Sequence, residues 1–342
     1  MSGDRLRVGV VGLGAFGDLH CRTLAQMPDV RLVAVASRSA DRRAEIAARY
    51  DVPHACADVK ELVGATEVQA VVVASASEHH AAHVHAALAA GKHAFVEKPF
   101  TTDADSARTL ADMALRLGLH LQVGFLSRYD ARLKRIDEAI TRGDLGAVSM
   151  MLFTRSVSRD VATAATYLDP VTETMSHDVD LALWFGRQRV KRLQATTHHA
   201  LGLDDRPDSC SAQLVLADGS SALLQADWLL PTAAPRNIRD GHRSLVATCT
   251  VVGAHGRAQA RLMGDDLVLW TDEHVLHPLT GLWDTTFGSL EGALVRQARA
   301  FVEAAKGNAS HDAAAELRDA VHGLEVCAAI LRSAAEGTGV EL

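Results

Sequence analysis

The sequence has few cysteines, no long hydrophobic run and only a small excess of charge. Its five cysteines, Cys21, Cys56, Cys210, Cys249 and Cys327, are widely spaced and form no Cys-x-x-Cys pair, which argues against a disulfide framework and a zinc knuckle. No apolar run approaches the ~18 residues of a membrane-spanning helix, and the polar start of the chain lacks the pattern of a signal peptide. A net charge of -7 gives no reason to bind nucleic acid or an anionic membrane. We therefore expect a cytoplasmic protein with no nucleic-acid and no membrane partner.

The first part of the chain alternates short apolar runs with longer amphipathic stretches. Strands are expected at residues 8–11, 32–36, 70–74, 93–96 and 119–123, and helices at 19–27, 42–50, 80–90 and 105–117. This alternation is typical of parallel strands joined by crossover helices. It predicts an α/β fold in which residues 1–124 form a doubly wound parallel sheet.

The second part of the chain has a different pattern. A helix is expected at 133–142, and longer strands at 147–155, 190–197, 210–216, 221–228 and 245–252. Asp218-Gly219 predicts a hairpin turn, because this dipeptide accepts positive φ. The proline, the glycine and the mixed charge of residues 232–242 indicate a loop. Residues 125–342 are therefore expected to form a substrate-binding and oligomerisation α+β domain on a mostly antiparallel open sheet.

A glycine-rich segment follows the first predicted strand. Its residues Gly12, Gly14, Ala15, Phe16 and Gly17 follow the Gly-x-Gly-x-x-Gly spacing and precede a helix. The first glycine permits a tight turn, the second lets a pyrophosphate approach the backbone, and the third lets helix and strand pack closely. The helix N-terminus then offers N–H groups to the phosphates. This position predicts a Rossmann-type dinucleotide site; the alternative is a turn with no ligand.

The end of the second predicted strand indicates which dinucleotide is bound. NAD-binding domains place an acid there for the ribose hydroxyl, whereas this chain has Ser37 and Arg38. A hydroxyl and a guanidinium are able to bind a 2'-phosphate that a carboxylate would repel. We expect NADP to be preferred over NAD, although Asp41 is either a helix cap or a ribose ligand and Arg38 is alternatively a solvated loop residue.

Lys98 follows the fourth predicted strand and precedes Pro99, which keeps it out of a helix. This places Lys98 at the carboxyl edge of the sheet, where ligands of such folds bind. It is a candidate catalytic residue, and the alternative is a surface lysine in a loop.

At this point the sequence resembles the Gfo/Idh/MocA family of pyridine-nucleotide oxidoreductases. The resemblance covers nearly the whole chain. It rests on the glycine-rich turn, on Ala90-Gly91-Lys92-His93 leading to Glu97-Lys98-Pro99, on Arg128 within Gly124-Phe125-Leu126-Ser127-Arg128-Tyr129-Asp130, and on His177-Asp178-Val179-Asp180 followed by Trp184. The resemblance implies that Lys98 lies beside the nicotinamide and the reacting hydroxyl.

The resemblance also implies further cofactor-binding positions at Ser75, His80 and Glu97. His80 matches the histidine of the family's Thr-Pro-Asn-x-x-His loop, but Ser75-Ala76-Ser77 replaces the first three residues, so the proline is missing. The histidines around it are spaced as on a helix that faces solvent, and no metal is expected there or elsewhere.

A second cluster runs from Glu173 to His177. Many family members have Asp at the first position, four residues before the histidine, so that the acid orients the imidazole. Here the acid is Glu173, which is expected to orient His177 or to touch substrate itself; a satisfied histidine at a helix start is the alternative. The resemblance to inositol dehydrogenases implies that Arg128 and Asp130 bind substrate hydroxyls, and a surface ion pair is the alternative.

Together these residues predict an NAD(P)-dependent oxidoreductase that interconverts a secondary alcohol and a ketone on a sugar, nucleotide sugar or cyclitol. Lys98, or His177 held by Glu173, would carry the proton. The alternatives are an NAD-dependent glycosidase that oxidises its substrate transiently and a non-catalytic dinucleotide-sensing protein. Apolar side chains at successive strand positions, as in Met150-Met151-Leu152-Phe153, predict a homodimer or homotetramer that buries one face of the second sheet.

Overall fold

The computed structural model describes residues 5–160, 169–202, 206–231, 245–263, 269–270, 275–276, 281–286, 288–308 and 313–342. The chain forms two compact units, the first of residues 1–126 and 285–321 and the second of residues 127–284 and 322–342. The boundary expected after residue 124 lies close to the structural one. Residues 285–321, however, which were assigned to the second domain, pack with the first unit.

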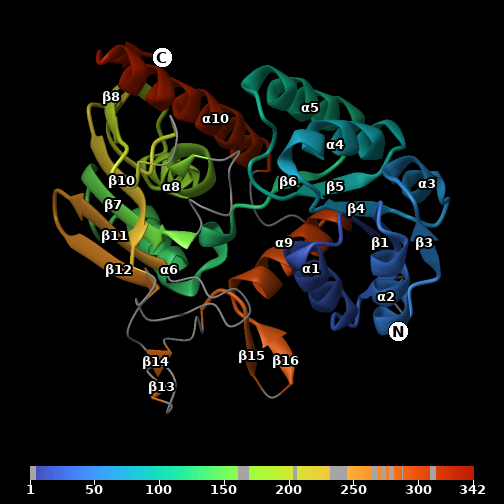
Figure 1. The fold of residues 1–342 in the computed structure, drawn as a ribbon. Coiled ribbons are helices and arrows are strands. Elements are labelled where there is room, and N and C mark those ends of the chain that lie inside the picture. The colour runs from blue at the N-terminus through green and yellow to red at the C-terminus, as the bar shows by residue number, and fades with distance from the viewer. Residues whose placement is uncertain are drawn as a thin grey trace. The chain divides into compact units, whose positions relative to one another are not determined.

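The first unit is a six-stranded parallel sheet in the order β3-β2-β1-β4-β5-β6. Its strands are β1 (Leu6–Val11), β2 (Val30–Ala36), β3 (His54–Cys56), β4 (Ala70–Val73), β5 (His93–Val96) and β6 (Leu121–Val123). Its helices are α1 (Ala15–Ala25), α2 (Ala40–Tyr50), α3 (Val59–Gly64), α4 (His80–Ala89), α5 (Ala104–Leu117) and α9 (Ala293–Ala305), with a 3₁₀ turn η1 (Ser77–His79). Figure 1 shows α4 and α5 on one side of the strands and α1 and α9 on the other. This is the doubly wound sheet that the apolar runs predicted.

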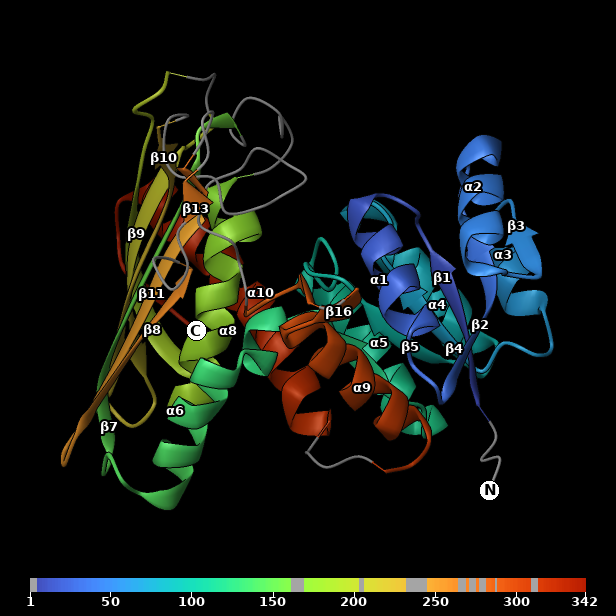
Figure 2. The same cartoon turned by 90° about the horizontal axis from the view of Figure 1, so that it is seen from below.

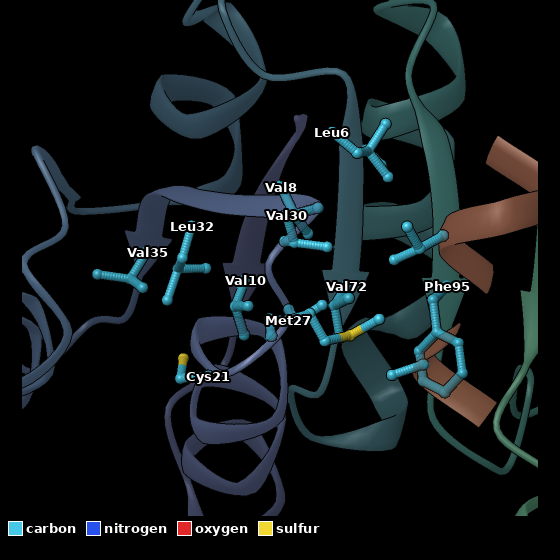
Figure 3. Packing of buried hydrophobic residues seen from close by; sticks show 14 of the residues in the cluster. Leu6, Val8, Val10, Cys21, Met27, Val30, Leu32, Val35, Val72 and Phe95 are labelled. Carbon is cyan, nitrogen blue, oxygen red and sulfur yellow. The ribbon is translucent and has the colours of Figure 1, made fainter. Parts of the chain in front are cut away.

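The apolar runs are continuous because both faces of the parallel strands are covered. On one face, Val10, Val72 and Phe95 point from their strands toward Cys21 and Met27, at α1 and just after it (Figure 3). Each large side chain that becomes fully buried contributes about 1.5–3 kcal/mol.

The late segment 285–321 completes the same core. Phe301 and Val302 of α9 belong to this hydrophobic cluster. The side-chain amide of Gln26 pairs with Leu290 of the short strand β16 (Ser289–Glu291), donating to its carbonyl at 2.7 Å and accepting from its N–H at 2.9 Å. These contacts join residues more than 260 positions apart, which is why local patterns did not reveal them.

Strand β3 and helix α3 were not expected from the sequence. β3 has only three residues, too few to show a periodicity. Helix α3 does have a local signal: the Asp58 side chain accepts from the Glu61 N–H at 2.9 Å, and Glu61 accepts from the Ala57 N–H at 2.7 Å. This reciprocal pair is close to a capping box, and it identifies the helix start in retrospect.

The second unit is a seven-stranded mixed sheet in the order β12-β11-β7-β10-β9-β8-β17. Its strands are β7 (Val148–Ser158), β8 (Val190–His198), β9 (Ser209–Leu216), β10 (Ser221–Leu230), β11 (Leu245–Gly253), β12 (Arg257–Met263) and β17 (Val340–Glu341). All the described pairs are antiparallel except β7 with β10, which is parallel. Gly219, at φ +90°, makes the expected hairpin turn between β9 and β10. The mostly antiparallel sheet is therefore confirmed.

Helices cover one face of this second sheet. They are α6 (Ala131–Arg142), α8 (Ser176–Gly186) and the end of α10 (Ala313–Glu336), preceded by the short turns η2 (Leu126–Tyr129) and η3 (Val171–Met175). Figure 2 shows α6 and α8 along one side of the sheet, seen nearly edge-on. On the opposite face, Met150, Leu223 and Val246 are exposed, while Met151 and Leu224, their neighbours in sequence, are buried under the helices.

The smaller elements are β13 (Leu269–Trp270), β14 (Val275–Leu276) and β15 (Asp284–Thr286). The loop expected at 232–242 lies outside the described residues. Within the part of the chain that the structure describes, none of the helices has both the length and the apolar character needed to cross a membrane.

Candidate active site

The glycine-rich turn after β1 is shaped by close backbone contacts. Gly12 has φ +88°, and a Cβ there would lie 2.5 Å from the Ser75 nitrogen. A Cβ on Gly17 would lie 1.9 Å from the Gly12 carbonyl oxygen, whereas one on Gly14 would meet no atom within 4 Å. Gly12 and Gly17 are thus required by packing, and Gly14 leaves open space beside the backbone of the turn.

Helix α1 begins at Ala15, within this glycine-rich segment. Gly14 is its N-cap, and no side chain caps the helix. Gly14, Ala15 and Phe16 are exposed, so the positive end of the helix faces outward at the turn. The uncapped helix start and the open space at Gly14 fit the pyrophosphate of a dinucleotide.

Arg42 of α2 braces the same turn, a role that sequence analysis did not assign. Its Nε donates to the Leu13 carbonyl at 2.8 Å, and its guanidinium also donates to Asp18 of α1 at 3.0 Å. Asp18 accepts in addition from the Tyr50 hydroxyl and from Arg49, both at 2.8 Å. Burial raises the pKa of the Asp18 carboxyl, but these donors outweigh it and hold the pKa below the usual value.

The end of β2 carries Ser37 and Arg38 where an acid would select NAD. The Ser37 hydroxyl faces the Ser39 N–H at 3.4 Å, and Arg38 is exposed. Arg43 donates to the Ser37 carbonyl at 2.7 Å, which brings a second guanidinium to this loop. Ser39 accepts from the Arg42 N–H and caps α2, so Asp41 is a first-turn residue of that helix and not its cap.

His80 links two loops at the carboxyl edge of the sheet. It is 1% exposed. Its Nε2 lies 2.9 Å from the Ser75 carbonyl oxygen, after β4, and its Nδ1 lies 2.7 Å from the Pro99 carbonyl oxygen, after β5. The Ser75 hydroxyl lies 2.9 Å from Nδ1 of His83. The loop without the family's proline is thus held by histidines instead.

Glu97, Lys98 and Pro99 follow β5 at the same edge. Lys98 is half-buried. Glu97 Oε1 accepts from Nε2 of His20, on α1, at 2.7 Å, and Glu97 Oε2 lies 3.3 Å from the Lys98 backbone nitrogen. His20 is 77 positions away from Glu97 and was not singled out from the sequence, since no local motif connects them.

Arg128 and Asp130 are both buried and both lie in ion pairs within the second unit. Arg128 donates to the two carboxylate oxygens of Asp180 at 2.7–3.0 Å, and its guanidinium lies over the ring of Trp184. Asp130 caps α6 by accepting from the Arg132 N–H, and it also receives the Arg132 side chain at 2.7 Å. Both residues therefore form ion pairs, as the alternative interpretation expected. The Arg128–Asp180 pair is buried on both sides, whereas Asp130 is buried but its partner Arg132 is 33% exposed.

Glu173 and His177 lie on either side of a change in helix type. Residues Val171–Met175 form a π-helical turn, and α8 begins at Ser176. Asp169 starts this segment by accepting from the N–H groups of Val171 and Thr172. Glu173 and His177 are half-buried. π-helical turns are rare in proteins, and those that occur are often found at functional sites.

Asp178, next to His177, has a partner on the sheet. Arg155 of β7 donates to both of its carboxylate oxygens, at 2.8 Å and 3.1 Å in the shortest contact to each. The two side chains are 4% and 1% exposed. Asp178 and Asp180 thus attach the first turns of α8 to two arginines, Arg155 and Arg128.

In the first unit, the structure brings together the glycine-rich turn, Ser75, His80, Glu97 and Lys98 at one edge of the sheet. In the second unit, Arg128 forms an ion pair with Asp180 of α8, the helix that carries His177 and Asp178 in its first turn. No three His, Cys, Asp or Glu residues in the described ranges are grouped so that they could hold a metal ion.

Comparison with known proteins gives matches along most of the chain. Residues 6–125 match a family model described as "Oxidoreductase family, NAD-binding Rossmann fold", and residues 133–259 match the GFO/IDH/MocA C-terminal domain. The inositol 2-dehydrogenase/D-chiro-inositol 3-dehydrogenase of Shouchella clausii is 32% identical over 228 residues, which are 64% of this chain and 64% of that protein. The inositol 2-dehydrogenase of Rubrobacter xylanophilus is 36% identical over 56% of each chain. The matched part spans less than two thirds of either relative.

Solved structures resemble the whole chain. Scyllo-inositol dehydrogenase from Lactobacillus casei, with bound NAD(H) and scyllo-inositol, gives a TM-score of 0.83 at 18% identity over 99% of both chains. GenD2 from gentamicin A biosynthesis, in complex with NAD, gives a TM-score of 0.83 at 26% identity over 100% of this chain and 97% of its own. The first likeness shows a shared fold. Since the two parts of this chain match the two domains of one family in sequence order, the chain belongs to the Gfo/Idh/MocA family, with an NAD-binding Rossmann fold in its first part.

Proposed function

We propose that this protein is a nicotinamide-dinucleotide-dependent dehydrogenase that interconverts a secondary alcohol and a ketone on a cyclitol of the inositol type. The observation that carries this proposal is the half-buried Lys98, held at the edge of the sheet that also carries the glycine-rich turn. The relatives that are 31–36% identical and named inositol 2-dehydrogenases support the substrate class.

The residues of the chain have separate tasks in this reaction. The turn at Gly12–Gly17 and the start of α1 bind the pyrophosphate, and the bound dinucleotide supplies the hydride acceptor or donor. Lys98 takes the proton of the reacting hydroxyl in oxidation and returns it in reduction. His177, with Glu173, is the alternative proton carrier. Arg128 and Asp130 form ion pairs with Asp180 and Arg132. We therefore propose that they contribute to substrate binding by fixing the conformation of the segment that contains them.

NADP is proposed as the preferred cofactor over NAD. The loop after β2 offers the Ser37 hydroxyl and the exposed Arg38, and Arg43 reaches the same loop. A 2'-phosphate would receive charge-assisted hydrogen bonds there, whereas the ribose hydroxyl of NAD would lack the acid that usually binds it.

A homodimer or homotetramer is proposed to form through the exposed face of the second sheet. Met150, Leu223 and Val246 are 37%, 41% and 45% exposed and come from three neighbouring strands. An apolar face of this kind is usually covered in an oligomer. Light scattering at micromolar concentration should give a multiple of 36.5 kDa, and a mass of one chain would contradict the proposal.

The substrate class is tested by a screen that follows the absorbance of the reduced nicotinamide. Myo- and scyllo-inositol, common aldoses and nucleotide-linked sugars are compared in both directions with NAD and NADP, and Lys98→Met serves as the inactive reference. We expect turnover with at least one inositol. Turnover with aldoses or nucleotide-linked sugars alone would change the substrate class, and no turnover with any of them would contradict the dehydrogenase assignment.

A further inference from the structure

We propose that His20 and His80 are positioning residues that hold Lys98 from its two sides, His20 through Glu97 and His80 through Pro99. This inference rests on the proposed function of Lys98 as proton carrier. Neither histidine needs to touch substrate, because each acts on a residue adjacent to Lys98 in the chain.

His20 fixes the residue before Lys98. Its ring is 3% exposed, and Nε2 donates to Glu97 Oε1 at 2.7 Å. The ring also packs edge-on against Phe95 of β5, with 5.1 Å between ring centroids. Helix α1 is thereby bound to the end of β5 by a polar and an aromatic contact.

Gly124 provides the space in which Glu97 lies. A Cβ on Gly124 would be 2.8 Å from Glu97 Oε2 and 3.0 Å from the Glu97 Cα. Glu97 is therefore enclosed between α1 and the residue that follows β6, with Oε2 directed to the Lys98 backbone nitrogen at 3.3 Å. Because both oxygens of the Glu97 carboxylate are held, the peptide bond between Glu97 and Lys98 has little freedom to rotate.

His80 fixes the residue after Lys98. Its two ring nitrogens face the carbonyl oxygens of Ser75 and Pro99. Carbonyl oxygens only accept, so a ring nitrogen that carries a proton donates to the carbonyl oxygen that it faces. The loop after β4 and the loop after β5 are then joined by one buried side chain.

Such support matters because the lysine side chain is long and has many rotamers. A reacting group displaced by about 1 Å costs about 100-fold in rate. Fixing the backbone on both sides of Lys98 restricts the position of its Cα. The side-chain amine then spends more time within reach of the reacting substrate hydroxyl.

The test compares variants that remove the contact with variants that keep it. His20→Leu and His80→Leu remove the donors, His20→Gln keeps one, and His20→Asn is a polar but shorter version for use if His20→Leu does not fold. Cys21→Ala and Val84→Ala are matched controls, because these residues are fully buried on the same two helices.

We expect His20→Leu and His80→Leu to lower kcat by about 10- to 100-fold. His20→Leu, which lies outside the expected cofactor-binding positions, should leave the Kd for the dinucleotide unchanged. The controls should lower the melting temperature but not kcat, and His20→Gln should restore most of the rate.

Coupling identifies the route through Glu97. If His20 acts on Lys98 through this carboxylate, His20→Leu combined with Glu97→Leu should lose no more kcat than Glu97→Leu alone. Additive losses, or losses equal to those of the controls, would overturn the positioning role.

A second measurement does not depend on turnover. Amide hydrogen exchange within residues 97–101, all of which carry an N–H except Pro99, should become faster in His20→Leu and His80→Leu than in the two controls. If the wild type turns over no inositol, the proposed function fails, and this measurement still decides the present proposal. Unchanged exchange in residues 97–101 would overturn it.

Discussion

The carboxyl edge of the first sheet and the start of α8 in the second unit both carry candidate chemical groups, but they hold them differently. Around Lys98 the contacts run from histidine rings to backbone carbonyls and to one carboxylate. Beside His177, Asp178 forms a buried ion pair with Arg155 on the sheet.

This difference has consequences for what each region tolerates. A buried ion pair holds a helix firmly but leaves an isolated charge when one partner is lost, which typically costs 3–5 kcal/mol. Hydrogen bonds between a ring and a carbonyl contribute less and cost less when broken. We therefore expect substitutions near Lys98 to change rate more than stability, and substitutions of the ion pairs beside His177 to change stability more than rate.

The largest effect on rate is expected from Lys98→Met. Loss of a general acid or base lowers kcat by about 10²- to 10⁴-fold, while the turn at Gly12–Gly17 should still bind dinucleotide. Stopped-flow or steady-state kcat and a binding titration measure the two effects. Lys60→Met changes an exposed lysine of α3 and is the control. Near-normal kcat in Lys98→Met at saturating substrate would remove Lys98 from the reaction.

The largest effect on stability is expected from Asp178→Asn. It leaves the buried Arg155 without its charge partner and should lower the free energy of unfolding by about 3–5 kcal/mol, measured by urea denaturation. Asp105→Asn is the control, because its ion pair with Arg108 is exposed and such pairs contribute little. If both variants change the unfolding midpoint equally, the contrast between the two regions is wrong.

The candidate chemical groups of these regions were identified from the sequence but the partners that hold them were not, and the reason is physical. Gly12, Gly14, Gly17 and the Glu97-Lys98 element carry their signal within a few residues, because turn geometry and strand ends are local. The partners that hold them are not local. His20 meets Glu97, and Arg155 meets Asp178, only after strands and helices have packed.

The same reason explains why residues 285–321, which pack with the first unit, were expected in the second domain. The strand β16 and helix α9 join the first unit through Gln26 and the core around Phe301, contacts that no spacing in the sequence indicates. The expected fold class did not depend on them, because periodicity alone identifies parallel strands with crossover helices.

Glu173 and His177 test whether the start of α8 also serves the reaction. If they act as a unit, Glu173→Gln should lower kcat/KM, and the double variant with His177→Ala should lose little more than His177→Ala alone, whose loss is expected at about 10²-fold. Kinetics of both single variants and the double variant decide this. An unaffected Glu173→Gln would leave the acid as a helix-start charge, worth about 0.3–1 kcal/mol of stability.

Cofactor preference is expected to depend on Ser37 at the edge of the first sheet. Ser37→Asp places a carboxylate where a 2'-phosphate would lie, and losing a charge-assisted hydrogen bond is worth about tenfold in affinity or more. Titration of NADP and NAD into both proteins measures the ratio of the two dissociation constants. Tighter binding of NAD by the wild type, or an unchanged ratio in Ser37→Asp, would contradict the preference.

The smallest expected effect concerns Asp18, which belongs to an ion cluster that supports the glycine-rich turn. Its pKa is lower in the folded protein than the usual Asp value, because donors from Tyr50, Arg42 and Arg49 outweigh the effect of burial. A lowered carboxyl pKa stabilises the folded state above the unfolded pKa of about 4, and this contribution disappears as the pH falls through the folded pKa. The difference in unfolding free energy between the wild type and Asp18→Asn should therefore be largest near neutral pH and shrink below pH ~4. Tyr50→Phe removes one donor and should move this loss to a higher pH; a difference that does not change with pH would show that the cluster supports the turn by packing and not by charge.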